Sequence, residues 1–214
     1  MENKLIVISF SGGRTSAYMT KFILKNEKYK NNEKLIVFAN TGKERQETLD
    51  FVHKFEKHIN RKIHWLEADV QEGKGNGTRH KEVTYETASR KGEPFEDVIK
   101  KYTIPNQAFS HCTRELKLAP IRSFLRSKGL KKGDYLEAIG IRADEQHRIN
   151  WQQAKKDNKI YPLATDKRVD SSYIRRYWKS MPFDLELKDY EGNCDLCYKK
   201  SRRKLLTILI ENPR

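Results

Sequence analysis

The chain has 214 residues, with 44 Lys or Arg against 29 Asp or Glu, and its formal net charge is +15 at pH 7. That length suits one α/β domain with a small appendage. We find no apolar stretch long enough to span a bilayer and no secretory signal, so we expect a cytoplasmic protein without a membrane partner. The 3 cysteines are an odd number, which disfavours a disulfide framework in a reducing compartment.

The first predicted element is a buried strand over residues 5–8, a run of apolar and β-branched residues. It leads into Ser-Phe-Ser-Gly-Gly-Arg-Thr-Ser at residues 9–16, and a helix is predicted over 15–25. The paired glycines permit a tight turn, and the free N–H groups at a helix N-terminus bind anions. The loop therefore predicts a phosphate or sulfate site, to which hydroxyls of Ser11, Thr15 and Ser16 contribute.

Alternating strands and helices follow this loop. A strand over 35–39 ends at Asn40-Thr41-Gly42, a helix is predicted over 44–58, and a third strand over 63–66. Such alternation predicts parallel strands with right-handed crossovers, whose ligands bind at the carboxyl ends of the strands. We therefore expect the glycine loop and Asn40-Thr41-Gly42 to face one ligand.

The rest of the chain predicts shorter elements. Residues 71–79 read as a loop, which is either a lid or a surface connection, and 83–101 are weakly helical. A helix over 113–128 contains Pro120, where it starts or kinks. A strand over 135–139, an extended segment over 160–163 and helices over 171–180 and 199–210 follow. We expect the main domain to span 1–165, with a C-terminal segment over 166–214 packed on it.

Two further features of the second half have open interpretations. The basic run over 199–204 opposes the dipole of its helix, and it either contacts a nucleic-acid backbone or is solvated. Large aromatic side chains are expected to pack in the core rather than to stack on bases. These aromatic residues are Trp65, Trp151, Tyr173 and Trp178.

The cysteines form the second candidate site. Cys194 and Cys197 make a Cys-x-x-Cys motif, and Cys112 follows His111. Two thiolates at this spacing can bind one metal ion or one edge of a cluster. The same spacing also serves thiol redox chemistry, and small buried cysteines can be purely structural.

Several segments, in the same order along nearly the whole chain, resemble the phosphoadenylylsulfate (PAPS) reductase family of the PP-loop superfamily, in the short form that phages often encode. Residues 9–16 resemble the Ser-Gly-Gly-x-Asp-Ser loop, with Thr15 where many members carry Asp. Residues 111–121 resemble the Cys-Cys-x-x-Arg-Lys-x-x-Pro-Leu segment of iron–sulfur adenylylsulfate reductases, with His111 in place of the first cysteine. Residues 40–51 resemble Asp-Thr-Gly…Pro-Glu-Thr…Phe, and residues 140–144 resemble Gly-x-Arg-x-Asp.

The resemblance implies a parallel, twisted α/β sheet flanked by helices, of the adenine nucleotide α-hydrolase type, with a small C-terminal metal-binding segment. It implies a nucleotide site formed by Ser9, Ser11, Gly12, Gly13, Arg14, Thr15, Ser16, Asn40, Thr41, Gly42 and Gly140. It implies catalytic or charge-neutralising roles for Arg142, Lys117 and Arg114. It implies that Cys112, Cys194 and Cys197 hold a metal centre, which is either zinc, with His111 as fourth ligand, or a 4Fe–4S cluster bound by the three thiolates alone.

The leading functional expectation is ATP-dependent sulfur transfer, in which ATP, with Mg²⁺, adenylates an acceptor oxygen that sulfur then displaces. The positive charge favours RNA or DNA as the acceptor, and a sulfur donor protein is a further expected partner. One alternative is reduction of PAPS or adenylylsulfate (APS) with an external thiol, because the chain lacks the reductases' C-terminal Glu-Cys-Gly-x-His tail. The other is a non-catalytic nucleotide-binding module with structural zinc. A protein encoded by a phage would work in the host cytoplasm.

Overall fold

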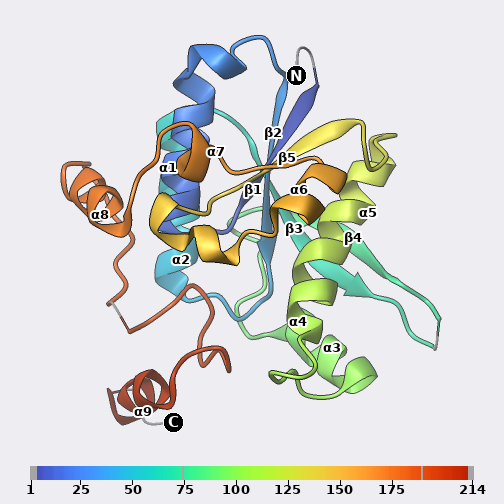
Figure 1. Cartoon of the computed structure of the whole chain (residues 1–214). Coiled ribbons are helices and arrows are strands. Elements are labelled where there is room, and N and C mark those ends of the chain that lie inside the picture. Colours follow the sequence, from blue (N-terminus) through green and yellow to red (C-terminus); the bar gives the residue numbers. More distant parts are fainter. Residues whose placement is uncertain (1–3, 74, 189, 212–214) are drawn as a thin grey trace. The chain divides into compact units, whose positions relative to one another are not determined.

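A computed structural model of the chain describes residues 4–73, 75–188 and 190–211. Six strands form one sheet in the order β4-β3-β2-β1-β5-β6, flanked by helices (Figure 1). The strands are β1 (Leu5–Phe10), β2 (Lys34–Asn40), β3 (Ile63–Val70), β4 (Thr78–Val83), β5 (Tyr135–Ile139) and β6 (Lys159–Ile160). The expected α/β fold is therefore confirmed.

The chain divides into two compact units. The first unit comprises the described residues of Met1–Phe38, Phe51–His64 and Leu125–Leu185, and the second comprises those of Ala39–Asp50, Trp65–Phe124 and Glu186–Arg214. The helices in chain order are α1 (Arg14–Lys25), α2 (Gln46–Ile59), α3 (Glu93–Tyr102), α4 (His111–Thr113), α5 (Ala119–Ser127), α6 (Trp151–Lys156), α7 (Pro162–Thr165), α8 (Ser171–Lys179) and α9 (Arg202–Glu211). Two 3-10 turns span Glu27–Tyr29 and Ala143–Arg148.

The first unit is built on parallel pairing of β1 with β2 and with β5. Ile8 lies opposite Ile36 on one side and Ala138 on the other. The apolar run of β1 is fully buried at Ile6, Val7 and Ile8, as expected for a strand inside a parallel sheet. The carboxyl ends of β1 and β5 consequently lie beside each other, because Ser9 pairs with Ile139.

An aromatic cluster fills the core of the first unit. The Trp178 ring on α8 lies 4.9 Å from the Phe51 ring and 6.0 Å from the Phe55 ring, centroid to centroid. The prediction that Trp178 is a core residue is confirmed, since it is 0% exposed. The same prediction is wrong for Trp151, which is 48% exposed and contacts Tyr161 by one edge.

In the second unit, β3 and β4 are antiparallel, with Trp65 opposite Val83 and Val70 opposite Thr78. The sequence did not predict β4 as a strand: the loop expected over 71–79 overlaps its first two residues, and its antiparallel pairing departs from the parallel pairing expected of the other strands. The physical reason is the short connection over 71–77, because a parallel crossover needs about a dozen residues or more.

Proline decides two other local outcomes. Pro162 begins α7, so the expected extended segment over 160–163 is helical in its second half; the fixed φ of proline suits the first turn of a helix. The predicted helix over 113–128 is present as α4, a π-helical turn over Arg114–Leu118 and α5. In the π-helical turn, the N–H of Ala119 bonds to the carbonyl of Arg114, directly before the Pro120 ring that cannot donate.

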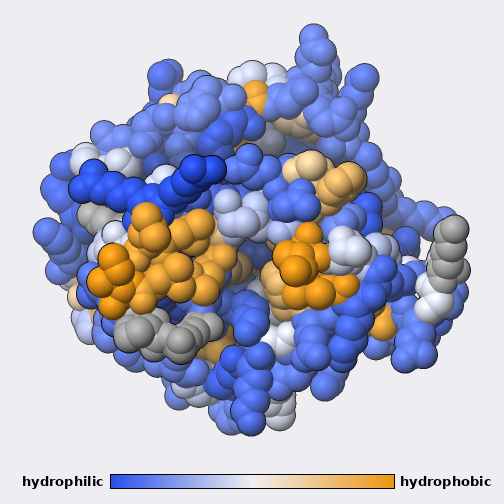
Figure 2. All heavy atoms as spheres, turned by 90° about the horizontal axis from the view of Figure 1, so that it is seen from below, coloured by the Kyte–Doolittle hydropathy of each residue, from blue (hydrophilic) through white to orange (hydrophobic). Residues whose placement is uncertain are grey.

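Large apolar side chains of the second unit remain exposed. Figure 2 shows two apolar patches on one face, with a hollow between them. The exposed large apolar residues among the described part of this unit are Ile104, Phe109, Leu196, Leu206, Leu209 and Ile210. Within the described residues, none of the helices combines the length and the apolar character needed to cross a lipid bilayer.

Candidate functional site

The glycine loop of the first unit joins β1 to α1. Gly12 has a positive φ of 76°, and Gly13 caps α1 in an extended conformation without a side-chain hydrogen bond to the cap. Ser16 donates its hydroxyl to the carbonyl of Gly13 at 2.9 Å and accepts from the backbone N–H of Ser11 at 3.2 Å. The turn is thus closed by Ser16, and no capping side chain takes the first amides of this twelve-residue helix.

Two residues from the end of β5 complete this loop. Gly140 lies so close to it that an added Cβ would be 3.2 Å from the Cα of Ser16. Arg142 donates from Nη1 to the hydroxyl of Thr15 at 3.2 Å. The Arg142 guanidinium also binds both carboxylate oxygens of Asp144 and approaches Glu145 to 3.1 Å. Hydrogen bonds from Arg142 lower the pKa of Asp144, so the Asp144 carboxylate that fixes this cation beside the loop stays ionised.

Two other predicted residues of the loop have protein partners. Ser9 donates its hydroxyl to Glu137 Oε1 at 3.0 Å. Arg14 holds both carboxylate oxygens of Asp184 at 2.6 and 3.0 Å and also donates to the carbonyl of Leu185. The structure therefore brings Ser11, Thr15 and Ser16 together with Gly140 and Arg142, while the side chains of Ser9 and Arg14 bond to Glu137 and Asp184.

In the second unit, Asn40-Thr41-Gly42 is held by buried carboxylates. Asn40 donates to Glu67 Oε1 at 2.7 Å and to the carbonyl of Ser89 at 2.9 Å, and its own carbonyl oxygen accepts from the N–H of Gly42. Glu67 also accepts from the N–H and the hydroxyl of Ser89. Asn40 thus shapes the loop from within. Neither Glu67 nor Ser89 stands out in the sequence.

Gly42 is the tightest point of that loop. Its φ is +75°, and an added Cβ would lie 2.9 Å from Pro94 Cδ and 3.2 Å from the Cα of Gly92. We expect Gly42→Ala to destabilise the protein by about 3 kcal/mol, because backbone strain and overpacking add. Urea unfolding measures this. The matched control is Gly129→Ala, where φ is +77° but nothing lies within 4 Å, and it should cost only about 1 kcal/mol. Equal losses in the two variants would contradict the packing argument.

Glu44 joins the same loop to the Cys-x-x-Cys motif. Its Oε2 accepts from the N–H and the hydroxyl of Thr41, both at 2.7 Å, and its Oε1 accepts from the thiol of Cys194 at 3.2 Å. The backbone supports this contact: Asp195 donates to the carbonyl of Lys43, and Arg45 donates to the carbonyl of Asn193. Glu44 and Cys194 therefore face each other across a short antiparallel bridge.

The three thiols line one cavity of about 440 Å³ in the second unit. Lys117 enters it, with Nζ 3.7 Å from the Cys194 sulfur and 3.9 Å from Glu44 Oε1. The Cys112 thiol contacts the hydroxyl of Tyr198 at 3.8 Å. Among the described residues, no three His, Cys, Asp or Glu side chains are arranged to hold a single metal ion. The thiols therefore converge on a space larger than one ion rather than on a point.

His111 and Arg114 are turned to other partners. The His111 ring stacks on the rings of Tyr102 and Phe109, at 5.5 and 6.0 Å. Arg114 donates to Glu115 at 2.6 Å and lies over the Tyr102 ring. Of the residues predicted between 111 and 117, the structure places Cys112 and Lys117 at the cavity and gives His111 and Arg114 an aromatic and acidic environment instead.

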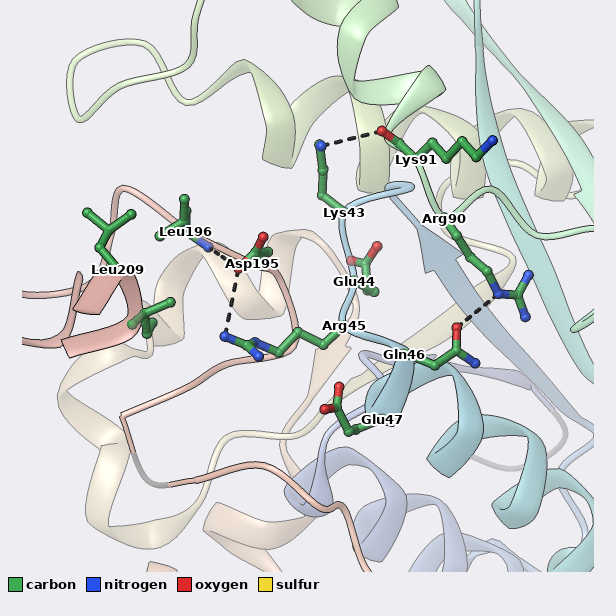
Figure 3. A pocket seen from close by; sticks show the side chains of 11 residues that line it. Lys43, Glu44, Arg45, Gln46, Glu47, Arg90, Lys91, Asp195, Leu196 and Leu209 are labelled. Carbon is green, nitrogen blue, oxygen red and sulfur yellow. Dashed lines mark hydrogen bonds and ion pairs between the residues drawn. The ribbon is translucent and has the colours of Figure 1, made fainter. Parts of the chain in front are cut away.

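A second cavity, of about 480 Å³, is shown in Figure 3, and it shares three lining residues with the first. Lys43, Asp195 and Leu196 line both. Arg45 also lines the second cavity, and its guanidinium forms ion pairs with Glu191 at 2.9 Å and with Asp195 at 3.8 Å. The remaining lining is polar or charged at Glu44, Gln46, Glu47, Arg90 and Lys91, and apolar at Ile208 and Leu209.

Cys194 has an unusual thiol. Burial and the negative charge of Glu44 raise its pKa to about 12, while the charge of Lys117 works against that shift. Glu44→Gln removes the negative charge, so we expect the pKa of Cys194 to fall and its alkylation by iodoacetamide, in metal-free protein at about pH 8, to accelerate about tenfold. Mass spectrometry of the modified peptide measures the rate. Glu47→Gln is the control. An equal acceleration in that variant would show that the charge of Glu44 does not act specifically on the Cys194 thiol.

The fold and these two sites define an α/β protein with a glycine loop at the start of α1 and a cavity lined by three cysteines. The phosphoadenosine phosphosulfate reductase domain model matches residues 5–175. An uncharacterized nin region protein of Escherichia phage lambda is 34% identical over 202 residues, which cover 93% of this chain and 67% of that protein. The chain belongs to the phosphoadenosine phosphosulfate (PAPS) reductase family.

More distant relatives share parts of this chain. An uncharacterized protein of Methanocaldococcus jannaschii is 26% identical over 180 residues, which cover 84% of this chain but only 28% of that protein. The U34-tRNA thiolase NcsA of Methanococcus maripaludis, solved with its [4Fe-4S] cluster, has a TM-score of 0.54 at 16% identity, covering 98% of this chain and 66% of that one. PAPS reductase of Candida auris, in a phosphate complex, has a TM-score of 0.49 at 15% identity, with coverage of 81% and 71%. The thiolase comparison supports a shared fold.

Proposed function

We propose that this protein binds an adenine nucleotide and transfers sulfur in an ATP-dependent reaction, with a sulfur-bound metal centre. The observation that carries the proposal is the convergence of Cys112, Cys194 and Cys197, all the cysteines of the chain, on one cavity. Membership of the PAPS reductase family and the fold shared with an iron–sulfur tRNA thiolase support sulfur chemistry at such a site.

The nucleotide belongs at the glycine loop in this proposal. Open amides at the start of α1 and the hydroxyls of Ser11 and Ser16 suit phosphate oxygens, and Arg142 supplies a fixed positive charge beside Thr15. Adenylation joins an acceptor oxygen to the α-phosphorus of ATP and releases pyrophosphate. Hydrosulfide then attacks the acceptor carbon, and the carbon–oxygen bond breaks with AMP as the leaving group.

The donor set of the second unit fits a polynuclear sulfur-bound centre. Three thiols are the ligands that such clusters prefer, and the cavity of about 440 Å³ leaves room for more than one ion. A single zinc fits less well, because no three suitable donors among the described side chains meet at one point. When bound by three thiolates, a 4Fe–4S cluster supplies an iron with a free position for sulfide. Lys117 would hold a positive charge beside Cys194 and orient an anionic sulfur species.

The acceptor is proposed to be RNA or DNA. The formal net charge of +15 attracts a polyanion. An ATP-dependent reaction would use Mg²⁺ carried by the nucleotide, since Thr15 stands where many family members have a carboxylate. The phage lambda relative suggests that the reaction takes place in a host cytoplasm.

Anaerobic purification followed by iron and acid-labile sulfide analysis tests the centre. We expect roughly four iron and four sulfide atoms per chain, and their loss in Cys112→Ser, Cys194→Ser and Cys197→Ser. His111→Ala is the matched control and should retain the centre, because its ring lies in the aromatic stack. Pyrophosphate release from ATP that depends on added RNA or DNA tests the reaction. A colourless protein that binds nucleotide without turnover would contradict the proposal and favour a non-catalytic module.

Sulfonucleotide reduction with an external thiol is the second candidate. It is favoured by the contact between Arg142 and Thr15, which puts a cation where a magnesium-binding carboxylate is common in the superfamily. The Arg142 guanidinium could neutralise the anionic groups of a sulfonucleotide directly, so that no metal ion would be needed at this loop. Sulfite release from PAPS in the presence of thioredoxin would establish this reaction, and its absence alongside RNA-dependent pyrophosphate release would exclude it.

A further inference from the structure

Helix α9 begins with an electrostatic conflict. Arg202, Arg203 and Lys204 form its first turn, which contains no acidic residue, and all three are exposed. The N-terminal end of a helix carries a partial positive charge, so cations there are unfavourable. An anionic partner at this end would relieve the repulsion.

The second half of α9 exposes large apolar side chains to solvent. Leu206 and Leu209 are exposed, Ile210 is 77% exposed, and Ile208 is the buried residue of the helix. A helix of ten residues is marginal by itself and depends on packing of its apolar side. Surface apolar residues are common singly, but a contiguous group marks an interaction site.

A second apolar patch lies across the thiol cavity from α9. Ile104 is 69% exposed and Phe109 is 60% exposed. Figure 2 shows one patch over α9 on the left and another on the right, with the hollow between them. Ile104 and Leu196 line the cavity of the three thiols, while Leu196 and Leu209 line the neighbouring cavity. The mouth of the thiol cavity thus has an apolar rim that continues onto α9.

We propose that this rim docks an acidic protein that presents its own apolar patch. We define the docking face by its exposed residues, Ile104, Phe109, Leu196, Arg202, Arg203, Leu206, Leu209 and Ile210. Its apolar members are aliphatic except Phe109, whereas nucleic-acid surfaces use aromatic rings to stack bases. A second copy of this chain would bring another formal charge of +15, which disfavours self-association. A partner with acidic residues around an apolar patch would pair with the basic first turn of α9 and cover its exposed apolar side chains.

Fluorescence anisotropy with a defined probe tests this inference, which does not depend on the proposed reaction. The probe is a labelled amphipathic peptide of about 18 residues, with Glu on one face of its helix and Leu on the other. We expect it to bind, and we expect both Leu206→Ser/Leu209→Ser and Arg202→Glu/Arg203→Glu to weaken binding about tenfold or more. The control is Lys57→Glu/Lys131→Glu, an equal charge change at exposed sites in the first unit, which should weaken binding less than about twofold.

Three outcomes would overturn the inference. The first is equal binding of a peptide with the same residues in scrambled order, which would indicate charge alone. The second is wild-type affinity in the leucine variant. The third is an RNA oligonucleotide that binds more tightly than the peptide and depends on Arg202 and Arg203 but not on the leucines. Because the substituted side chains are exposed, circular dichroism and thermal unfolding of each variant should match the wild type.

Discussion

Replacement of Trp178 by alanine is expected to lower the free energy of unfolding by about 4 kcal/mol. The side chain is fully buried, and its ring packs against Phe51, Phe55 and Phe183. Alanine would leave a cavity that these rings cannot close. It would also remove the hydrogen bond of 2.9 Å from the indole N–H to the carbonyl of Arg14. The loss therefore combines missing packing with a lost buried hydrogen bond.

Urea unfolding of two further variants separates these causes. Trp178→Phe keeps most of the ring packing and loses the hydrogen bond, so it should cost about 1–2 kcal/mol. Trp151→Ala removes an indole that is half exposed and should cost less than about 1 kcal/mol. Since Arg14 begins α1 directly after the glycine loop, Trp178→Phe also tests how firmly that loop is held. A loss at Trp178→Ala no larger than that at Trp151→Ala would refute the prediction.

Replacement of Glu67 by alanine is expected to cost about 3 kcal/mol. Glu67 is 3% exposed and accepts three hydrogen bonds, from the side chain of Asn40 and from the N–H and hydroxyl of Ser89. Alanine would leave these buried donors without their acceptor, and each unsatisfied group costs about 1–3 kcal/mol. Thermal unfolding and urea titration measure the loss.

Glu67→Gln refines this test, because it keeps the volume and one acceptor oxygen. It should fall between the wild type and Glu67→Ala. Glu72→Ala, at an exposed position in the connection between β3 and β4, is the control and should change stability by less than about 0.5 kcal/mol. If Asn40 affects the proposed nucleotide only by shaping its loop, then disturbing its partner should have the same effect. Glu67→Gln and Asn40→Ala should in that case weaken nucleotide binding equally. Unchanged stability in Glu67→Ala would contradict the network.

The sequence predicted those elements whose pattern is local. Residues 5–8 and 135–139 are short apolar runs, and both are strands in the structure. The turn at Gly12 and Gly13 followed from the need for a positive φ and for open amides. By contrast, β4 has the polar sequence Thr-Arg-His-Lys-Glu-Val, which carries little strand signal. It is an edge strand of the sheet, and edge strands commonly carry charged side chains.

The candidate site was predicted less completely than the fold. The cysteines and Lys117 stand in recognisable segments, but Glu44 and Cys194 are 150 positions apart, and no local pattern joins them. Their contact depends on backbone pairing between residues 43–45 and 193–195. His111 was expected as a ligand because it stands in place of the first cysteine of the resembling segment, but its ring stacks on Tyr102 and Phe109. Spacing along the chain limits which side chains can meet, and packing selects among them.

The bridge between Glu44 and Cys194 also determines when the thiol cavity can form during protein synthesis. Cys112 and Lys117 leave the ribosome long before Cys194 and Cys197 are translated. Domains fold as their segments emerge from the exit tunnel, so the cavity cannot be complete until residues 194–199 have emerged as well. Translation products that end before residue 194 therefore lack two of the three cysteines that line this cavity.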